Sequence, residues 1–307
     1  MKRNARRAVS GIVLLDKPAD FTSNQALQHV RRLYRAEKAG HTGSLDPLAT
    51  GMLPVCLGTA TKVCSYLLDA RKSYRVRARL GRSTDTGDAQ GSVVGVSPQV
   101  EFSKEAVEEV LGGFTGEYEQ VPPMYSALKY KGQRLYTLAR QGVEVPRKPR
   151  TVRIFRLELR NLQSQELQFD VTCSKGTYVR ALVEDIAGGL CTLGHVHALR
   201  RTSVGPFGEA QMVTLAALED FASEGREALD RCLLPVDRAL TSWPRVVVPA
   251  ALRGPFTSGR AAAAQSVWPR GQVRVYSPDG EFLGIGEVSA TGSLAPRRVF
   301  AVSRNAK

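Results

Sequence analysis

Asp46 is a carboxylate in a loop of turn-forming residues, a setting where catalytic side chains tend to collect. It directly precedes Pro47 and lies between Gly43 and Gly51. A carboxylate held in such a loop can serve as a nucleophile or as a base. A structural interpretation competes, because an Asp-Pro pair commonly initiates a turn or caps a short helix. Both roles stay open for Asp46 on its own.

Three further polar side chains could take part in chemistry, and each has a structural alternative. Tyr74 opens a strand-like segment and could be an ordinary core aromatic residue. Arg180 could be a surface residue in the first turn of a helix. Asp88 ends the segment Ser-Thr-Asp-Thr-Gly-Asp, in which both acids could be acceptors in Asx turns. The residue types alone do not identify a reaction for these side chains.

Several established catalytic patterns are absent from the sequence. No Gly-rich segment has dinucleotide or P-loop spacing, since residues 58–62 lack the required pattern. The four histidines show no metal-ligand spacing, and no serine lies in a GxSxG motif. The five cysteines are scattered and never form a CxxC pair. We therefore expect no metal site, no nucleotide-driven enzyme and no serine hydrolase.

The chain is basic, with 43 Lys and Arg against 29 Asp and Glu and a net charge of +14 over 307 residues. This excess predicts a polyanionic partner, because basic side chains bind phosphates by releasing counterions. A basic surface without a specific partner is the alternative. The hydrophobic fraction of 43% excludes a disordered or fibrous chain. No apolar run nears the ~20 residues of a membrane span, and the cysteine usage fits a reducing cytoplasm.

The elements that must position these side chains follow from hydrophobic spacing. A helix is predicted from Thr22, which supplies its cap. Residues 74–80 alternate apolar and basic types, which predicts a strand with one buried face and three arginines on the other. The other predicted elements are strands at 53–57, 155–159 and 167–173 and helices that begin near Thr59 and Tyr178. This mixture indicates an α+β protein.

Residues 124–153 carry eight basic side chains, one acid (Glu144) and the aromatic residues Tyr125, Tyr130 and Tyr136. Basic groups interleaved with aromatics suit a surface that follows a nucleic-acid backbone and stacks on bases. The alternative is a solvated loop and helix without a partner. Further on, the composition shifts after about residue 215, and residues 267–300 are short apolar runs broken by turns. We place a domain boundary near residue 245, followed by a small all-β module.

The motifs as a set resemble those of the bacterial TruB family, the tRNA pseudouridine-55 synthases. The resemblance extends over nearly the whole chain, and its strength lies in the number of motifs in the family's order. The matching segments are residues 11–18, 21–23, 41–51, 58–62, 72–81, 83–91, 121–142, 174–180 and 197–202. The C-terminal module falls where the family carries an RNA-binding domain of the PUA type.

The resemblance implies a pseudouridine synthase fold on a mixed, largely antiparallel sheet, plus a small C-terminal all-β PUA-like domain. It implies a catalytic domain at residues 1–245, with an RNA-gripping insertion at about 121–153, and an RNA-binding domain at 246–307. The implied reaction isomerises the uridine at position 55 in the T-loop of tRNA, after the base has flipped out. No cofactor is implied, because uracil is both leaving group and returning nucleophile. We expect a cytoplasmic monomer that binds the tRNA T-stem-loop without a membrane or a guide RNA.

The resemblance also assigns roles to single residues. Asp46 matches the essential carboxylate, which attacks C1′ or abstracts a sugar proton, and Arg180 matches the cation that keeps it ionised. Tyr74 matches the residue that stacks on uracil, and its hydroxyl is a candidate base for the C5 proton. Tyr178 and Leu199 match the lining of the uracil pocket. The other matches are His41, which would fill the space left in the RNA, and four residues with either an RNA contact or a supporting role, namely Lys17, Pro18, Lys62 and Asp88.

Three positions depart from the family's usual pattern. Ser44 replaces a threonine and Val179 an isoleucine, and both changes are mild. Asp20 stands where glycine is usual. That change affects the geometry of one turn, and aspartate tolerates unusual backbone angles better than most residues.

Two other functions stay open. One is a uridine isomerase of the same fold that acts on another RNA. The other is a non-catalytic tRNA chaperone that unfolds and refolds the tRNA elbow with the same basic surface. A ribosome- or mRNA-binding protein whose active site has lost its catalytic activity is disfavoured, because Asp46, Tyr74 and Arg180 are all present.

Overall fold

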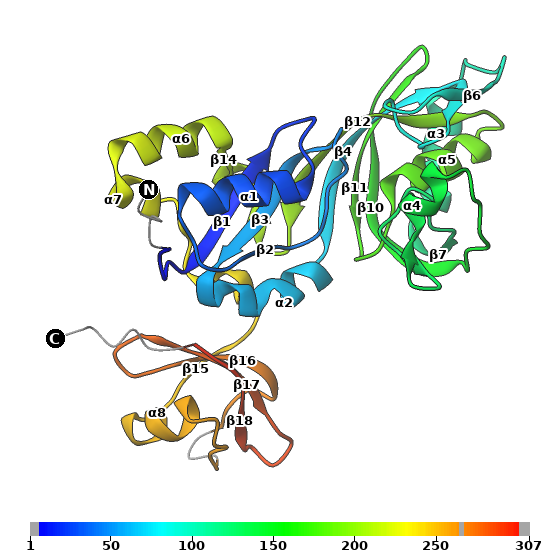
Figure 1. Cartoon of the computed structure of the whole chain (residues 1–307). Coiled ribbons are helices and arrows are strands. Elements are labelled where there is room, and N and C mark those ends of the chain that lie inside the picture. The colour runs from blue at the N-terminus through cyan, green and yellow to red at the C-terminus, as the bar shows by residue number, and fades with distance from the viewer. Residues whose placement is uncertain (1–5, 264–266, 301–307) are drawn as a thin grey trace.

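The computed structural model describes residues 6–263 and 267–300. Residues 1–5 and 301–307, the outer ends of the two predicted domains, lie outside the described residues, as do residues 264–266. A large sheet with flanking helices runs across the upper part of Figure 1, and a smaller sheet lies below it. The predicted α+β class is confirmed.

The large sheet has ten strands. Among the described neighbours, β1 with β14 and β3 with β12 are parallel, and the other pairs are antiparallel. The order across the sheet is β14 (Val213–Thr214), β1 (Gly11–Lys17), β3 (Thr50–Leu57), β12 (Gly194–Val204), β4 (Lys72–Leu80), β11 (Glu166–Cys173), β10 (Arg150–Gln163) and β7 (Gly116–Gln120), with β2 (Ala39–His41) beside β3 and β13 (Phe207–Gly208) beside β12. This arrangement confirms a mixed, largely antiparallel sheet.

The part of the sheet around β1 and β3 is covered on both faces. Ile12 and Leu14 of β1 share one apolar cluster with residues of short helices on one face. Val13 and Leu15 share another on the opposite face. Because both faces are buried, β1 is a continuous apolar run without alternation. The covering helices are η1 (Gly58–Val63), α2 (Cys64–Asp69) and η3 (Val236–Leu240) on the first face and α1 (Ser23–Leu33), α6 (Leu215–Glu224) and α7 (Arg226–Asp230) on the second.

Helix α1 begins where its capping residue predicts. The Thr22 hydroxyl accepts the Gln25 N–H at 3.1 Å, and the Gln25 side chain accepts the Thr22 N–H at 2.8 Å. This reciprocal capping box satisfies backbone donors that a helix start leaves free. The helix predicted near Thr59 is also present, but it opens with the 3₁₀ turn η1 before α2 follows.

Strand β4 shows the predicted alternation of buried and exposed residues. The arginine side chains of β4 are less available to phosphates than the sequence suggests, because acidic side chains of the neighbouring strand β11 lie opposite them. The Arg77 guanidinium lies 2.8 Å from the Glu166 carboxylate, and that of Arg75 lies 3.5 Å from Asp170. Arg79 completes this face of the strand.

The other part of the sheet, around β10 and β11, is covered by helices α3 (Lys104–Gly113) and α5 (Val179–Gly189), which pack on β4, β11 and β12. A hairpin of β5 (Arg82–Thr84) and β6 (Val93–Val96) follows β4. After β7, the chain leaves the sheet and forms a second hairpin, β8 (Lys129–Tyr130) and β9 (Gln133–Arg134), and helix α4 (Leu135–Arg140). It rejoins the sheet at Arg150 of β10 (Figure 1).

The C-terminal sheet has four strands, β15 (Arg245–Val247), β16 (Gly271–Tyr276), β17 (Phe282–Val288) and β18 (Leu294–Val299), accompanied by helix α8 (Ala250–Thr257). A core of its own includes Phe256 and Trp268. The Tyr276 hydroxyl donates to Asp237 at 2.6 Å, and Phe300 joins the cluster beneath β1, so this sheet is docked on the main body. The short 3₁₀ turn η2 (Glu209–Gln211) completes the elements.

No described helix is long and apolar enough to span a membrane. Among the described residues, no group of three or more His, Cys, Asp and Glu side chains is placed to hold a metal ion.

Candidate active site

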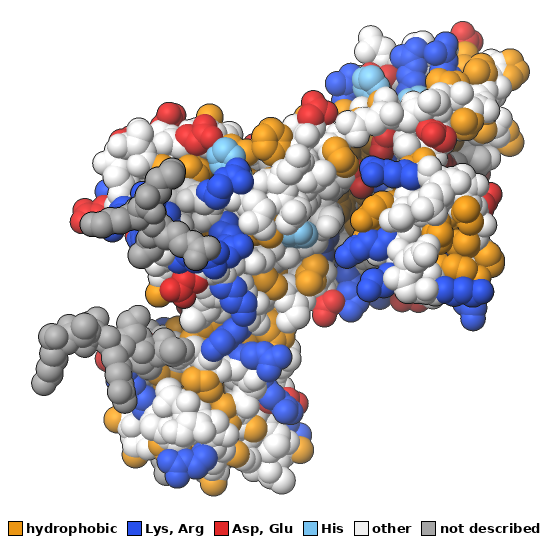
Figure 2. Space-filling view, viewed as in Figure 1, with side chains coloured by type: hydrophobic (Ala, Val, Ile, Leu, Met, Phe, Trp, Pro, Cys, Tyr) orange, Lys and Arg blue, Asp and Glu red, His pale blue; other side chains and the backbone are white. Residues whose placement is uncertain are grey.

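A cavity of about 740 Å³ opens beside β4 and β12. Its walls come from the loop at residues 43–47, the two strands, the start of α5 and the segment between β7 and β10. Figure 2 shows the surface hollowed between the two parts of the upper body, with Lys and Arg side chains on one side of the hollow. Six of the ten predicted site residues line this cavity, namely Asp46, Tyr74, Asp88, Tyr178, Arg180 and Leu199.

The loop that carries Asp46 is fixed on both sides by buried polar contacts. The Ser23 hydroxyl accepts the Leu45 N–H at 2.7 Å and donates to its carbonyl at 3.1 Å. The Pro47 carbonyl accepts the Asp20 N–H at 2.9 Å and the Lys17 ammonium at 3.2 Å. Because the residues before and after Asp46 are both held, its carboxylate keeps one position at the cavity wall.

Arg180 pairs with Asp46 through two guanidinium nitrogens. Its Nε lies 2.9 Å from Oδ2, and its Nη2 donates to Oδ1 at 3.3 Å. The same guanidinium donates to the carbonyls of Thr86 and Tyr125, both at 2.7 Å. The Arg180 side chain is 7% exposed, whereas that of Asp46 is 42% exposed. The buried Arg180 guanidinium therefore fixes the position of the Asp46 carboxylate, which itself stays exposed to a substrate in the cavity.

The charge state of Asp46 reflects opposing effects. Burial raises its pKa above the ordinary value of 3.8, and Arg180 opposes that rise. The Asp88 carboxylate adds to the rise, and Lys17 reduces it. Two donors from Arg180 to the two oxygens suit the ionised form.

Tyr74, Tyr178 and Leu199 form the aromatic and apolar part of the cavity wall. Tyr74 lies on β4 directly opposite Arg201 of β12. Burial raises the pKa of Tyr74, and Arg201 opposes that rise. Burial also raises the pKa of Tyr178. Both phenols are therefore protonated at neutral pH, and their rings can hold a planar heterocycle.

Comparisons with known proteins match the chain along nearly its whole length. The model described as TruB family pseudouridylate synthase, N-terminal domain, matches residues 31–179. Two C-terminal models follow, tRNA pseudouridylate synthase B C-terminal domain at 180–241 and pseudouridine synthase II TruB, C-terminal, at 244–300. A curated tRNA pseudouridine synthase B from Nitrosococcus oceani is 49% identical over 302 residues, which cover 97% of this chain and 98% of the relative.

The chain belongs to the TruB family. It is therefore a pseudouridine synthase. A second curated tRNA pseudouridine synthase B, from Stutzerimonas stutzeri, is 52% identical over 298 residues and 97% of both chains. The crystal structure of a Cbf5-Nop10-Gar1 complex contains a chain with a TM-score of 0.75 and 26% identity, covering 95% of this chain and 85% of that one. An H/ACA RNP bound to a substrate RNA gives a TM-score of 0.74 at 24% identity and supports the fold.

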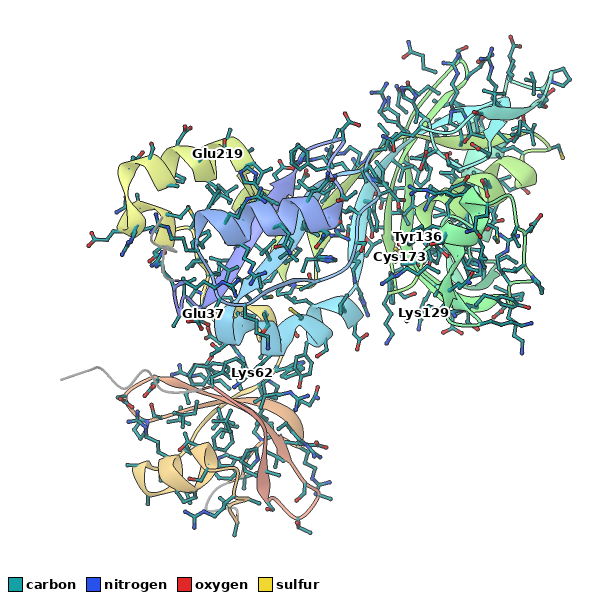
Figure 3. The ribbon with its side chains drawn as sticks, in the orientation of Figure 1. Glu37, Lys62, Lys129, Tyr136, Cys173 and Glu219 are labelled. Carbon is teal, nitrogen blue, oxygen red and sulfur yellow. The ribbon has the colours of Figure 1, made fainter. Side chains whose placement is uncertain are left out.

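Two predicted site residues of this TruB chain, Lys17 and Lys62, do not line the cavity and donate to protein carbonyls. The Lys17 side chain is fully buried, and its ammonium donates to the carbonyls of Pro18 and Phe21 at 2.7 Å as well as to Pro47. Lys62 donates to the Val299 carbonyl at 2.5 Å, where it lies between α2 and the C-terminal sheet (Figure 3). In this structure Lys17 fixes the Asp46 loop and Lys62 holds the C-terminal sheet.

The other predicted residues occupy three different settings. Pro18 is half-buried next to Lys17 and outside the cavity wall. His41 ends β2, and burial lowers its pKa, which favours a neutral ring. Asp88 lines the cavity, where its Oδ1 accepts the Gln90 N–H at 3.1 Å and its Oδ2 lies 3.8 Å from Arg180. Its Asx-turn role and its place beside the Asp46–Arg180 pair therefore coexist.

Arg201 is a cavity-lining residue to which sequence reasoning assigned no role. Its side chain is 1% exposed, and it donates to the carbonyls of Met52 at 2.6 Å and Gly43 at 3.1 Å. It thereby ties the Asp46 loop to β12 and places a cation beside Tyr74. The sequence signal that could have identified Arg201 is its position inside the segment at residues 197–202, which matches a motif of the family.

The pH dependence of the reaction should reflect the raised pKa of Asp46. We expect Asp46 to act as nucleophile or base in its ionised form, so that activity is lost as the pH falls through that pKa. We expect the acid limb of the kcat/KM profile to lie above pH 3.8, the ordinary value. Circular dichroism at each pH controls for unfolding. Full activity in a folded enzyme down to about pH 4 would contradict this assignment.

Gly51 of β3, which follows the Asp46 loop, is expected to tolerate no side chain. It pairs with Arg201 of β12, and its backbone there has a left-handed conformation. Its φ is +94°, and a Cβ there would lie 2.3 Å from the Arg201 carbonyl oxygen. We expect Gly51→Ala to lower the free energy of unfolding by at least about 2 kcal/mol in denaturant titration. Gly208→Ala is the matched control, because nothing lies within 4 Å of its added Cβ. Equal stability of the two variants would refute the expected clash.

Proposed function

We propose that this pseudouridine synthase acts on tRNA and that its target is the uridine at position 55 in the T-loop. The observation that carries the proposal is the Asp46–Arg180 pair at the wall of an open cavity. The curated relatives at 49% and 52% identity, both tRNA pseudouridine synthase B, support the choice of RNA. The net charge of +14 fits a polyanionic substrate.

The proposed reaction exchanges one bond for another at the same sugar carbon. The N1–C1′ bond breaks, and uracil leaves with its electron pair. The base then turns in the pocket, C5 forms the new bond to C1′, and the proton on C5 is released. In one route Asp46 attacks C1′ and is displaced by C5. In the other it removes a sugar proton as uracil leaves, which gives a glycal-like intermediate, and returns that proton to the sugar when C5 bonds to C1′. Both routes need the ionised carboxylate that Arg180 favours.

The pocket walls suit a base that must turn without escaping. We propose that uracil lies against the Tyr74 ring, with Leu199 and Tyr178 as the other contacts. The target base must first leave its stack in the T-loop, which costs a few kcal/mol. The buried Tyr74 phenol is protonated at neutral pH, so its role as acceptor of the C5 proton requires Arg201 to stabilise the phenolate.

The segment at about 121–153 is proposed to grip the RNA beside the cavity. Its Tyr125, Tyr136 and Arg140 line the cavity. Figure 3 shows Tyr136 on the side of α4 that faces the middle of the molecule. We propose that this built-in segment replaces a guide RNA, that the enzyme works as a monomer, and that residues 246–307 form a PUA-like RNA-binding domain.

Mapping of the modified nucleotide tests the site assignment. A tRNA transcript treated with the enzyme is expected to contain one pseudouridine, at position 55 of the T-loop. The matched control transcript carries cytidine at that position and should contain none. Pseudouridine at another position, or in the control transcript, would contradict the T-loop assignment while leaving the enzyme class intact.

A further inference from the structure

The carboxamide of Gln120 makes a two-point contact with the backbone of Tyr178. Its Oε1 accepts the Tyr178 N–H at 2.8 Å, and its Nε2 donates to the Tyr178 carbonyl at 3.1 Å. The side chain is buried at 1% exposure, and Nε2 also donates to the Tyr118 hydroxyl at 2.5 Å. Gln120 thus engages both peptide groups that flank the Tyr178 side chain.

Tyr178 depends on this contact for its orientation. It is the residue before α5, with φ −96° and ψ 109°, and its own side chain makes no capping hydrogen bond. With both flanking peptides fixed, the direction of its Cα–Cβ bond is fixed as well. The Tyr178 ring is a wall of the cavity, so the Gln120 carboxamide contacts the backbone that carries this wall.

Gln120 also lies at a junction between the sheet and the segment proposed to grip RNA. It is the last residue of β7, and the chain leaves the sheet directly after it. Five residues later, the Tyr125 carbonyl accepts from Arg180 at 2.7 Å. The end of β7 therefore contacts the backbone of Tyr178, and the start of the segment contacts Arg180, the partner of Asp46.

We propose that Gln120 is a positioning residue for the isomerisation, which holds Tyr178 against the uracil ring. The inference rests on the proposed function of the cavity. Loss of the carboxamide leaves the Tyr178 N–H without a partner and leaves the Tyr178 carbonyl with the Leu182 N–H of α5 alone, at 3.0 Å, which frees the Tyr178 wall to move. A displaced wall slows the chemical steps, whereas surfaces that bind the tRNA backbone away from the cavity are unchanged.

The first test replaces the carboxamide by an apolar side chain of similar length. Gln120→Met is expected to lower kcat for tRNA by about tenfold to a hundredfold, with KM changed less than about threefold. Gln163→Met is the matched control, because Gln163 is exposed at the far end of β10, and its kcat should equal that of wild type. An unchanged kcat in a folded Gln120→Met variant overturns the proposal.

Gln120→Glu supplies a readout that packing alone would not produce. Its carboxylate cannot donate to the Tyr178 carbonyl, but a protonated carboxyl both accepts and donates, as the amide does. Its activity relative to wild type should therefore rise at least about fivefold as the pH falls through the pKa of the new group, which burial raises. The ratio to wild type removes the titration of the groups around it, which are Tyr118, Arg150, Tyr178, Arg180 and Asp185.

A pH-independent ratio for Gln120→Glu overturns the positioning role even if Gln120→Met fails to fold. The failure of the proposed function is distinct from both results. In that case the wild-type enzyme itself forms no pseudouridine in tRNA, whereas failure of the Gln120 proposal alone leaves wild type active.

Discussion

Asp46→Asn is expected to abolish pseudouridine formation, with a loss on the order of 10⁴-fold or more in single-turnover rate. Asparagine has nearly the shape of aspartate and can still accept a hydrogen bond from Arg180. It carries no negative charge, so it can neither attack C1′ nor remove a sugar proton. The loss should therefore come from chemistry alone. Chromatography of nucleosides from digested tRNA measures the product directly.

The same variant separates catalysis from a tRNA-folding role. The band of Lys and Arg side chains in Figure 2 runs from the region of α1 toward the C-terminal sheet, apart from the hollow at the active site. Because Asp46→Asn leaves that surface unchanged, its affinity for tRNA should stay within about threefold of wild type. An Asp46→Asn variant that still forms pseudouridine at an appreciable rate would show that the carboxylate is not essential.

Arg180→Lys is expected to lower kcat/KM by about 10²- to 10³-fold. A lysine keeps the positive charge but loses the planar fork that reaches both Asp46 oxygens and the carbonyls of Thr86 and Tyr125. The hydrogen bonds of Arg180 help to hold the Asp46 pKa down against burial, so their loss in Arg180→Lys should also move the acid limb of activity to higher pH.

The control for this substitution is Arg79→Lys on the exposed face of β4, which should leave the rate and the pH profile unchanged. Circular dichroism of Arg180→Lys separates a local defect from unfolding. A folded Arg180→Lys variant with wild-type activity would contradict the role of the guanidinium fork.

Local patterns in the sequence were sufficient to predict the elements that position the site. The Thr22 cap places α1, and period-two alternation places β4, because both signals arise within a few residues. Asp20 is a further case: its φ of +63° is the left-handed conformation that the usual glycine adopts readily and that aspartate tolerates.

Contacts between distant segments could not be predicted in the same way. The arginines of β4 looked free, but their acid partners lie on β11, some ninety residues further along the chain. The burial of Lys17 among carbonyls and the contact of Gln120 with Tyr178 also depend on the assembled fold. Residue type and spacing left two roles open for Asp46, the family resemblance singled out its carboxylate, and only the tertiary structure showed which polar groups hold its loop.

The most direct test of the central claim is tritium release from a tRNA transcript labelled at C5 of its uridines. C5 loses its hydrogen only if it becomes bonded to C1′, so each isomerised uridine releases one tritium. We predict that the wild-type enzyme releases the label of one uridine per tRNA and that Asp46→Asn releases none. No release from a folded wild-type protein that binds the tRNA would contradict the account and would favour a tRNA chaperone.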